Sequence, residues 1–242
     1  MKLSVNLNKI ALLRNARGEN YPNIEYFANK AIALGVDGLT LHPRPDHRHA
    51  TSNDVINLSK LTKEKGVEFN IEGNPFSKPK NDFLGFCELV EIIKPDQITL
   101  VPDSIDQITS DHGWSSGKHD DDLIIVIKKL KEYSNSAPIS LFIDSIEGVE
   151  YAYEMGATLI EIHTGEFSKA IETKNVKAVD DIVKIVKLAS KLNLSVNAGH
   201  DLNLNNLSYL VDIGNINEVS IGHAIIVCLL YTSDAADEWR SG

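Results

Sequence analysis

The stretch Lys65–Asn74 reads KGVEFNIEGN and contains the unit from which the fold can be inferred. Gly66 is typical of a helix C-terminus, because glycine readily adopts the left-handed conformation that often ends a helix. Val67–Glu72 alternates apolar and polar side chains, which is the pattern of a half-buried β-strand. Glu72 places a carboxyl group where this strand ends. The stretch therefore predicts a helix end, a short strand and a polar strand end in direct succession.

The same succession recurs along the chain. The turns Leu34-Gly35 and Met155-Gly156 fit two more helix ends. Helices with apolar residues three and four positions apart are predicted at Ile24–Leu34, Asn53–Lys65, Asp121–Tyr133 and Val179–Leu192. Further strands are predicted at Lys2–Leu7, Gly38–His42, Gln97–Val101, Ile139–Asp144, Thr158–His163, Leu194–Asn197 and Glu218–Ile221.

This alternation predicts an α/β fold, and about eight such units predict a (β/α)8 (TIM) barrel. The main alternative is a doubly wound open sheet. That fold usually has a Gly-rich phosphate loop after its first strand, and Asn6-Leu-Asn-Lys-Ile-Ala is not such a loop. No linker or low-complexity segment interrupts the chain. We therefore expect residues 1–226 to form a single barrel domain.

Composition narrows the class of protein. The 242 residues are 43% hydrophobic and 24% charged, which is usual for a globular domain. The net charge of -10 and the lack of a basic face argue against a nucleic-acid partner. Two distant cysteines favour a reducing compartment. The N-terminal stretch lacks the features of a signal peptide, and no apolar run approaches the roughly 18 residues of a membrane span. The expectation is a cytoplasmic protein with no membrane partner.

Polar and titratable residues gather where the predicted strands end. In a barrel the chemistry takes place at the C-terminal ends of the strands. His42 fits a general acid or base, or else a packing histidine. Glu72 fits a helix N-cap contact or a base with a pKa raised by burial. Glu161 alternates with apolar neighbours and shares a face with His163, so it should point into the barrel as a functional or tightly paired group.

Other residues suggest anion binding. Arg44 and Arg48 lie on the loop after His42, where guanidinium groups suit phosphate. Arg17, in the loop predicted to span residues 14–18 after the first strand, invites the same interpretation, while Arg14 is as easily structural. The dipeptides Gly199-His200 and Gly222-His223 follow strands seven and eight, where such barrels often bind phosphate. The loop at residues 109–118 is either plain surface or a mobile lid.

A metal site is a less favoured alternative. His42, His47 and His49 lie close in sequence, but Arg48 stands between the last two, and a cation repels a bound metal. We interpret His47 as a surface residue. A Schiff-base aldolase would need a lysine at a strand end, and none of the predicted ends offers one.

Several motifs, taken together, resemble one known family. They are Asn6-x-Asn-x-Ile-Ala-x-Leu-Arg-Asn-Ala-Arg-Gly18, His42-x-Arg-x-Asp-x-Arg-His49, Asn70-Ile-Glu72, Glu161-Ile-His-Thr-Gly165, Val196-Asn-Ala-Gly-His200 and Ile221-Gly-His-Ala224. In this order and spacing they resemble the pyridoxine 5'-phosphate synthase family, and the match runs from about residue 2 to residue 226.

The resemblance implies a (β/α)8 barrel that assembles as a homo-octamer and uses no metal and no organic cofactor. It also implies a reaction of vitamin B6 biosynthesis. In that reaction, 1-deoxy-D-xylulose 5-phosphate condenses with 3-amino-2-oxopropyl phosphate to give pyridoxine 5'-phosphate, phosphate and water. Imine formation, enolisation and dehydration each require proton transfers, so this chemistry needs several acid–base groups around one cavity.

The resemblance also implies roles for individual residues. His42 and Glu72 correspond to proton acceptors, His200 to the proton donor, and Glu161 to the group that stabilises the transition state. The predicted contacts to the aminoketone phosphate are Asn6, Arg17, Asp201, Gly222 and His223. The predicted contacts to the sugar phosphate are Asn8, Lys9, Arg44, His49 and Thr109.

The chain departs from the family pattern at three places. Asn8-Lys9 stands where many members have Asp-His, and Asp201 stands where many have glycine. Residues 227–242 are expected to be an atypical C-terminal tail rather than family sequence, which would leave the barrel without its normal last helix. Two rival functions remain open, a metal-dependent barrel hydrolase or isomerase and an inactive phosphosugar-binding barrel.

Overall fold

The computed structural model describes residues 1–103, 110, 112–117, 120–173 and 176–232 of the chain. Within these residues, parallel strands form a closed barrel in chain order, and the last strand pairs with the first. The strands are β1 (Lys2–Asn6), β2 (Gly38–Leu41), β3 (Glu68–Gly73), β4 (Gln97–Leu100), β5 (Ile139–Ile143), β6 (Leu159–His163), β7 (Ser195–Gly199) and β8 (Glu218–Ile221). The predicted (β/α)8 fold is confirmed.

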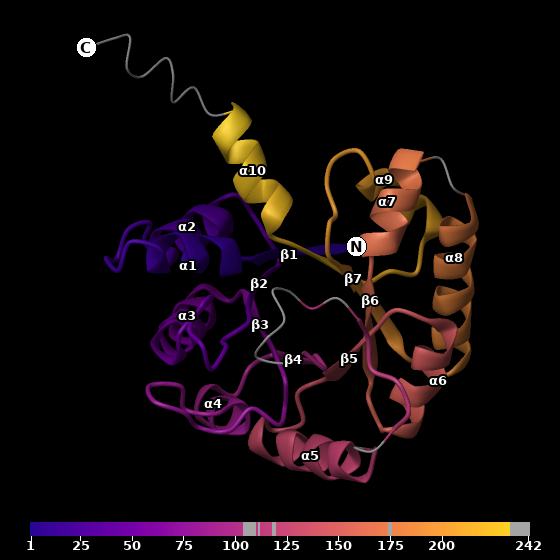
Figure 1. The fold of residues 1–242 in the computed structure, drawn as a ribbon, viewed down its shortest axis with the longest axis horizontal. Helices are drawn as coiled ribbons and strands as arrows, with labels where there is room; N and C mark the ends of the chain where they lie inside the picture. Colours follow the sequence, from indigo (N-terminus) through magenta and orange to yellow (C-terminus); the bar gives the residue numbers. More distant parts are fainter. Residues whose placement is uncertain (104–109, 111, 118–119, 174–175, 233–242) are drawn as a thin grey trace.

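Helices surround the barrel and cover the outward faces of the strands (Figure 1). Apolar residues on those faces, such as Leu39, Ile71 and Ile98, are fully buried against the helices. The helices are α1 (Asn8–Asn15), α2 (Ile24–Ala33), α3 (Ser52–Lys65), α4 (Phe86–Ile93), α5 (Asp120–Tyr133), α6 (Ile146–Glu154), α7 (Gly165–Thr173), α8 (Val176–Lys191), α9 (Leu207–Ile213) and α10 (His223–Thr232).

The segment after β1 differs from its prediction. The sequence interpretation treated residues 14–18 as the loop after the first strand, but α1 extends to Asn15 and includes Arg14. Ile10 and Ala11 are buried, so packing against the barrel stabilises this short helix. Arg14 makes two contacts to the carboxylate of Asp54 in α3, and its structural interpretation is confirmed.

Helix ends follow the predicted signals. Thr51 and Asp54 form a reciprocal capping box at the start of α3, which satisfies two backbone N–H groups. Gly66 ends that helix with φ of 67°. Gly35 and Gly156 also have positive φ, at 87° and 82°, after α2 and α6. These turns return the chain to the start of the next strand.

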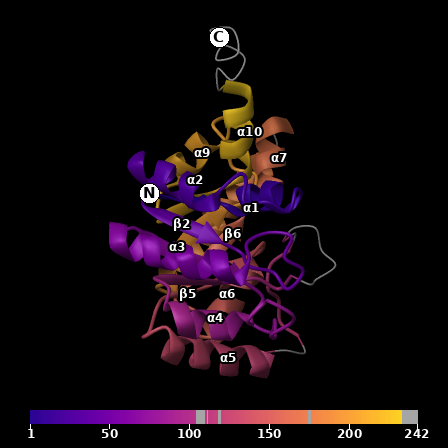
Figure 2. The ribbon, with the colours of Figure 1, turned by 90° about the vertical axis from the view of Figure 1, so that its left-hand side faces the viewer.

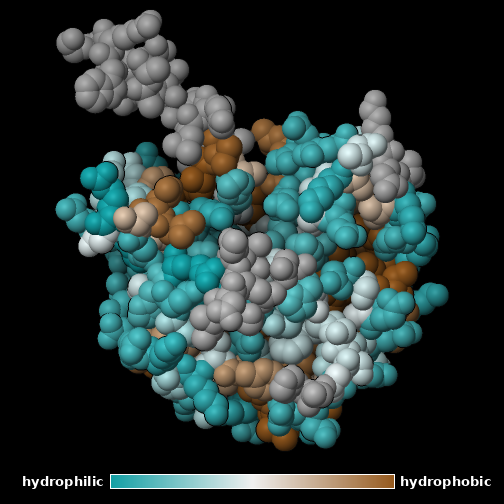
Figure 3. Space-filling view, in the orientation of Figure 1, coloured by the Kyte–Doolittle hydropathy of each residue, from teal (hydrophilic) through white to brown (hydrophobic). Residues whose placement is uncertain are grey.

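The last described helix, α10, leaves the barrel after β8 and extends away from the other helices (Figures 1 and 2). Its sequence, HAIIVCLLYT, is almost entirely apolar. Hydrophobic residues gather over the base of α10 and over α1 (Figure 3). Residues 227–232 are helical, while residues 233–242 lie outside the described part of the chain. That residues 227–242 form an atypical tail stays a prediction.

The inside of the barrel is polar. Many barrels fill this space with branched apolar side chains. Here the hydroxyls of Ser4 and Thr40 lie 2.7 Å apart, and Asn70 donates a hydrogen bond to Thr99 at 3.1 Å. β4 and β7 are not neighbours in the sheet. The Asn197 side chain of β7 nevertheless donates a hydrogen bond to the Gln97 side chain of β4 at 3.1 Å, across the interior of the barrel. The apolar core therefore lies between strands and helices.

In the part of the chain that the structure describes, no helix is both long and apolar enough to cross a lipid bilayer.

Candidate active site

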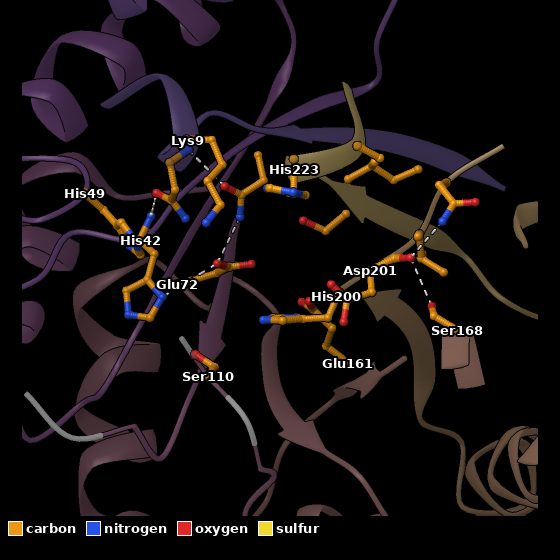
Figure 4. Close-up of a pocket in the computed structure, with 18 of the residues that line it drawn as sticks. Lys9, His42, His49, Glu72, Ser110, Glu161, Ser168, His200, Asp201 and His223 are labelled. Carbon is orange, nitrogen blue, oxygen red and sulfur yellow. Dashed lines mark hydrogen bonds and ion pairs between the residues drawn. The ribbon is translucent and has the colours of Figure 1, made fainter. Parts of the chain in front are cut away.

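A cavity of about 520 Å³ opens at the C-terminal end of the barrel (Figure 4). Its lining brings together most of the residues predicted from the sequence. Those residues are Asn6, Asn8, Lys9, His42, Arg44, His49, Glu72, Glu161, His200, Asp201, Gly222 and His223. Arg17 is exposed in the turn after α1 and is not part of this lining. Thr109 lies outside the described residues.

A chain of hydrogen bonds orders the residues at the ends of β1, β2 and β3. Asn8 accepts a hydrogen bond from the backbone N–H of His42 at 2.8 Å, and its own N–H donates to the Asn6 side chain at 3.0 Å. The Asn6 amide donates to Glu72 at 3.3 Å. Figure 4 shows these contacts on one wall of the cavity. The amide groups therefore hold His42 and Glu72 beside each other.

His42 and Glu72 lie beside each other, and the pKa of Glu72 suits proton transfer near neutral pH. Nδ1 of His42 lies 3.9 Å from Oε2 of Glu72. Burial, followed by the nearby Arg44 cation, lowers the pKa of His42 to about 3, so its imidazole is neutral. Burial, followed by the charge of Asp103, raises the pKa of Glu72 to about 7. A neutral imidazole and a carboxyl that titrates near pH 7 can both accept protons.

Glu161 lies deeper in the barrel and is only 2% exposed. Its Oε2 lies 3.4 Å from the Thr99 hydroxyl. Its Oε1 occupies the space that a side chain on Gly199 would take, so a larger residue at that position would displace the carboxyl group. Burial, followed by the charge of Glu72, raises the pKa of Glu161 well above its usual value. This direction favours the protonated form of Glu161, in which the group can donate a hydrogen bond.

His200 stands on a strained turn after β7. His200 and Asp201 have φ of 82° and 55°, a left-handed conformation that side chains other than glycine rarely adopt. Two rings pack against its imidazole, with those of Phe142 and His163 each centred 5.0 Å away. Burial, followed by His163, lowers the pKa of His200 to about 3. This strain places the ring over the cavity (Figure 4).

Polar groups from Thr164, from α7 and from the loop before α9 hold the turn at His200 and Asp201 in place. The Thr164 hydroxyl lies 2.7 Å from the carbonyl oxygen of Gly199 and 2.5 Å from that of His200. The side chains of Ser168 and Asn206 each donate to the carbonyl oxygen of Asp201 at 3.0 Å. The strained conformation is thereby stabilised by hydrogen bonds from neighbouring elements.

Cationic and N–H groups surround the upper part of the cavity. The side chain of Arg44 is buried, and its Nη1 lies 2.6 Å from the Asp103 carboxylate. Lys9 reaches the cavity from α1. His223 begins α10, so the N-terminal end of that helix faces the cavity, and such an end favours an anion. A side chain on Gly222 would collide with the carbonyl oxygen of Asn6, so only glycine lets β8 approach β1 here.

Sequence reasoning missed some residues that shape the site. Asp103 contacts both His42 and Arg44, and sequence reasoning did not single it out. Thr99 and Thr164 are fully buried hydroxyl residues whose partners come from other strands. For Asp103, its position just beyond a strand end was an available signal. His47 is not part of the cavity lining, and Arg48 pairs with Asp46 at 2.7 Å.

The metal alternative gains no support. Within the described residues, no group of three or more histidine, cysteine, aspartate or glutamate side chains is arranged to hold a metal ion. The prediction that no metal or cofactor takes part remains untested.

Fold and site together define an enzyme of the (β/α)8-barrel class, with acid–base groups and anion-binding groups around one cavity. The chain matches the family model described as "Pyridoxal phosphate biosynthesis protein PdxJ" over residues 3–234. This chain belongs to that family. It is 43% identical to a pyridoxine 5'-phosphate synthase of Xylella fastidiosa (strain 9a5c) over 233 residues, which cover 95% of this chain and 89% of the relative. A pyridoxine 5'-phosphate synthase of Xanthomonas axonopodis pv. citri (strain 306) is also 43% identical, with 95% and 91% covered.

Solved structures of other barrels share the fold only. A thiamine phosphate pyrophosphorylase from Pyrococcus furiosus is 15% identical, with a TM-score of 0.59, and the match covers 93% of this chain and 86% of the other. The citrate synthase SbnG is 9% identical, with a TM-score of 0.62 and coverage of 99% and 94%.

Proposed function

We propose that this protein is a pyridoxine 5'-phosphate synthase. It condenses 1-deoxy-D-xylulose 5-phosphate with 3-amino-2-oxopropyl phosphate, closes the pyridine ring of pyridoxine 5'-phosphate, and releases phosphate and water. The observation that supports this most directly is the pairing of a neutral acid–base cluster with two anion-binding regions around one cavity. The family membership and the name of the relatives agree with it.

The wall formed by β1 to β3 suits proton abstraction. His42 is neutral and Glu72 is ionised at and above pH values near 7, so both can take protons from carbon or nitrogen atoms of a bound substrate. At 3.9 Å the two groups are not hydrogen-bonded to each other, so each can act on its own atom of the substrate. We assign both as proton acceptors.

The opposite wall suits proton donation and charge stabilisation. His200 is neutral in the empty cavity, but the negative charge of bound phosphate groups raises the pKa of a nearby imidazole and favours its protonated form. His200 can then protonate a leaving hydroxyl group. Burial favours the protonated form of Glu161, and in that form it can donate a hydrogen bond to a developing oxyanion.

The two phosphate groups need separate binding regions. For the aminoketone phosphate we propose Asn6, Asp201, Gly222 and His223, where the start of α10 supplies backbone N–H groups. For the sugar phosphate we propose Asn8, Lys9, Arg44 and His49 on the other side. The contact roles of Arg17 and Thr109 stay predictions, as do the homo-octamer and the cytoplasmic location.

The experiment is to mix the protein with both phosphates and to follow the ultraviolet absorbance of the pyridine product together with released phosphate. We expect both signals to rise together, and each substrate alone to give neither. The assay is then repeated with a chelator, because a loss of activity would favour the rival function, a metal-dependent hydrolase or isomerase. Substrate binding without product would favour an inactive phosphosugar-binding barrel.

A further inference from the structure

Asp103 is a buried carboxylate that no role proposed above includes. It follows β4 by a few residues and is 5% exposed. Its carbonyl oxygen accepts a hydrogen bond from the Asn74 side chain at 2.8 Å, which fixes the backbone at this point. A buried charge is costly unless it is paired, so the partners of Asp103 indicate what it does.

Those partners are two residues of the site. Oδ2 of Asp103 lies 2.6 Å from Nη1 of Arg44 and 3.4 Å from Nε2 of His42. The other ring nitrogen of His42, Nδ1, faces Oε2 of Glu72 at 3.9 Å. The imidazole of His42 therefore stands between two carboxyl groups, one at each nitrogen.

A neutral imidazole carries a hydrogen on only one nitrogen, and the partner of each nitrogen decides which one. Burial raises the pKa of Asp103 to about 6, and the Arg44 cation opposes that rise. Burial raises the pKa of Glu72 further, to about 7. Asp103 therefore ionises before Glu72 as the pH rises, and its carboxylate attracts the N–H group of His42.

We propose that Asp103 is a positioning residue, which holds the hydrogen of His42 on Nε2 and leaves Nδ1, on the side of Glu72, as the basic nitrogen. This inference deepens the proposed function, because it rests on His42 as a proton acceptor. A carboxylate behind a catalytic imidazole fixes ring orientation and tautomer in the same manner in serine hydrolases.

The same carboxylate also orients the cation that is proposed to bind the sugar phosphate. Arg44 contacts Asp103 from the loop after β2, so one acid links the base to the anion-binding group. The other charged groups that act on Asp103 are His112 and Arg48, and both favour its ionised form. Glu72 acts on it with the same sign of charge.

The direct test measures the tautomer of His42 in the wild-type protein by ¹⁵N–¹H correlation NMR of the imidazole rings near pH 7.5. The His42 signals are assigned by their loss in the His42→Asn variant. We expect a protonated Nε2 and an unprotonated Nδ1. The opposite tautomer would overturn the proposal, and this result does not depend on any variant of Asp103.

The second test is the Asp103→Asn variant. The amide N–H of Asn can donate to Nε2, so we expect the hydrogen of His42 to move to Nδ1 and kcat to fall about a hundredfold, because nearly all of the enzyme then carries the hydrogen on the wrong nitrogen. Loss of the negative charge of Asp103 also lowers the pKa of Glu72. The acidic limb of the pH profile for kcat/KM should therefore move to lower pH.

The control is Asp181→Asn, which removes a negative charge from α8 on the outside of the barrel. Asp181 pairs with Lys184 at 2.8 Å and is not part of the cavity lining. We expect unchanged kcat and an unchanged tautomer in this variant. An Asp103→Asn protein with wild-type kcat and wild-type tautomer would contradict the proposal. The tautomer is read without turnover, so its outcome remains distinct from a failure of the proposed reaction.

Discussion

The two ends of the barrel are both polar, yet they differ in how their charges are satisfied. At the N-terminal end, a cavity of about 250 Å³ is lined in part by Lys2, Glu68 and Asp96. Lys2 pairs with Glu68 at 2.9 Å, and Asp96 accepts a hydrogen bond from the backbone N–H of Phe69 at 2.9 Å. These groups stabilise the starts of strands.

At the C-terminal end the titratable groups instead face the larger cavity. Burial displaces the pKa values of His42, Glu72, Glu161 and His200 from their usual range, and none of these residues is neutralised by a close salt bridge to lysine or arginine in the described part of the chain. The comparison teaches that polar strand ends do not by themselves mark an active site. The partners of most charges separate the two ends, and the exception at the N-terminal end is Glu218, whose pKa is raised by burial to about 8.

The largest expected effect comes from a pair of glutamates on one strand. Glu72→Gln removes a proposed proton acceptor at the C-terminal end of β3, and we expect turnover to fall about a thousandfold or more with the fold intact. The matched control is Glu68→Gln at the N-terminal end of the same strand, which should keep nearly full activity. Steady-state kinetics and circular dichroism of both variants test the comparison, and equal losses would contradict it.

A smaller effect is expected at the turn that carries His200. Thr164→Val keeps the side-chain shape but removes the hydroxyl that contacts the carbonyl oxygens of Gly199 and His200. We expect kcat to fall about tenfold, with little change in KM, because a proton donor rather than a phosphate contact is displaced. Thr164→Ser should restore most of the activity. A Thr164→Val variant with normal kcat would show that the Thr164 hydroxyl does not position His200.

The pH profile gives an effect of similar size. Glu72 acts as a base only when ionised, and its pKa is raised to about 7, so kcat/KM should fall about tenfold per unit as the pH drops below that value. The measurement is kcat/KM between pH 5 and pH 9 at constant ionic strength. An acidic limb near the ordinary carboxyl value would mean that Glu72 is not the titrating base.

The smallest effect is expected at the N-terminal end. Lys2→Met breaks the exposed ion pair with Glu68, and exposed pairs contribute about 0.5 kcal/mol or less to the free energy of unfolding. Activity should not change. Urea denaturation and the kinetic assay test this together, and a large loss of turnover would show that the two ends of the barrel are coupled.

Much of the fold could be predicted because strand and helix periodicities are local. The predicted strand at Glu218–Ile221 has the bounds found in the structure, and the helix predicted at Asn53–Lys65 begins one residue early, at Ser52. α1 was missed because its helical state depends on packing against the barrel rather than on a strong periodicity.

The site was predictable to a different extent. Period-two alternation placed Glu161 inside the barrel, and the strand ends placed His42 and Glu72 at the cavity. Alternation cannot show which loop folds over which strand. Asp103 therefore stayed unnoticed as a partner of His42, and Arg17, which shares a motif with site residues, is not brought to the cavity of this chain.

The polar interior also constrains how such a barrel can change during evolution. Thr99 lies within hydrogen-bond distance of both Asn70 and Glu161, so a single apolar substitution there removes the Glu161 contact and leaves Asn70 only its 3.5 Å hydrogen bond to Thr40. An apolar interior tolerates changes of volume one residue at a time, whereas a hydrogen-bonded interior requires several changes together. A change at the centre of this barrel therefore requires Thr99 to change together with Asn70 or Glu161.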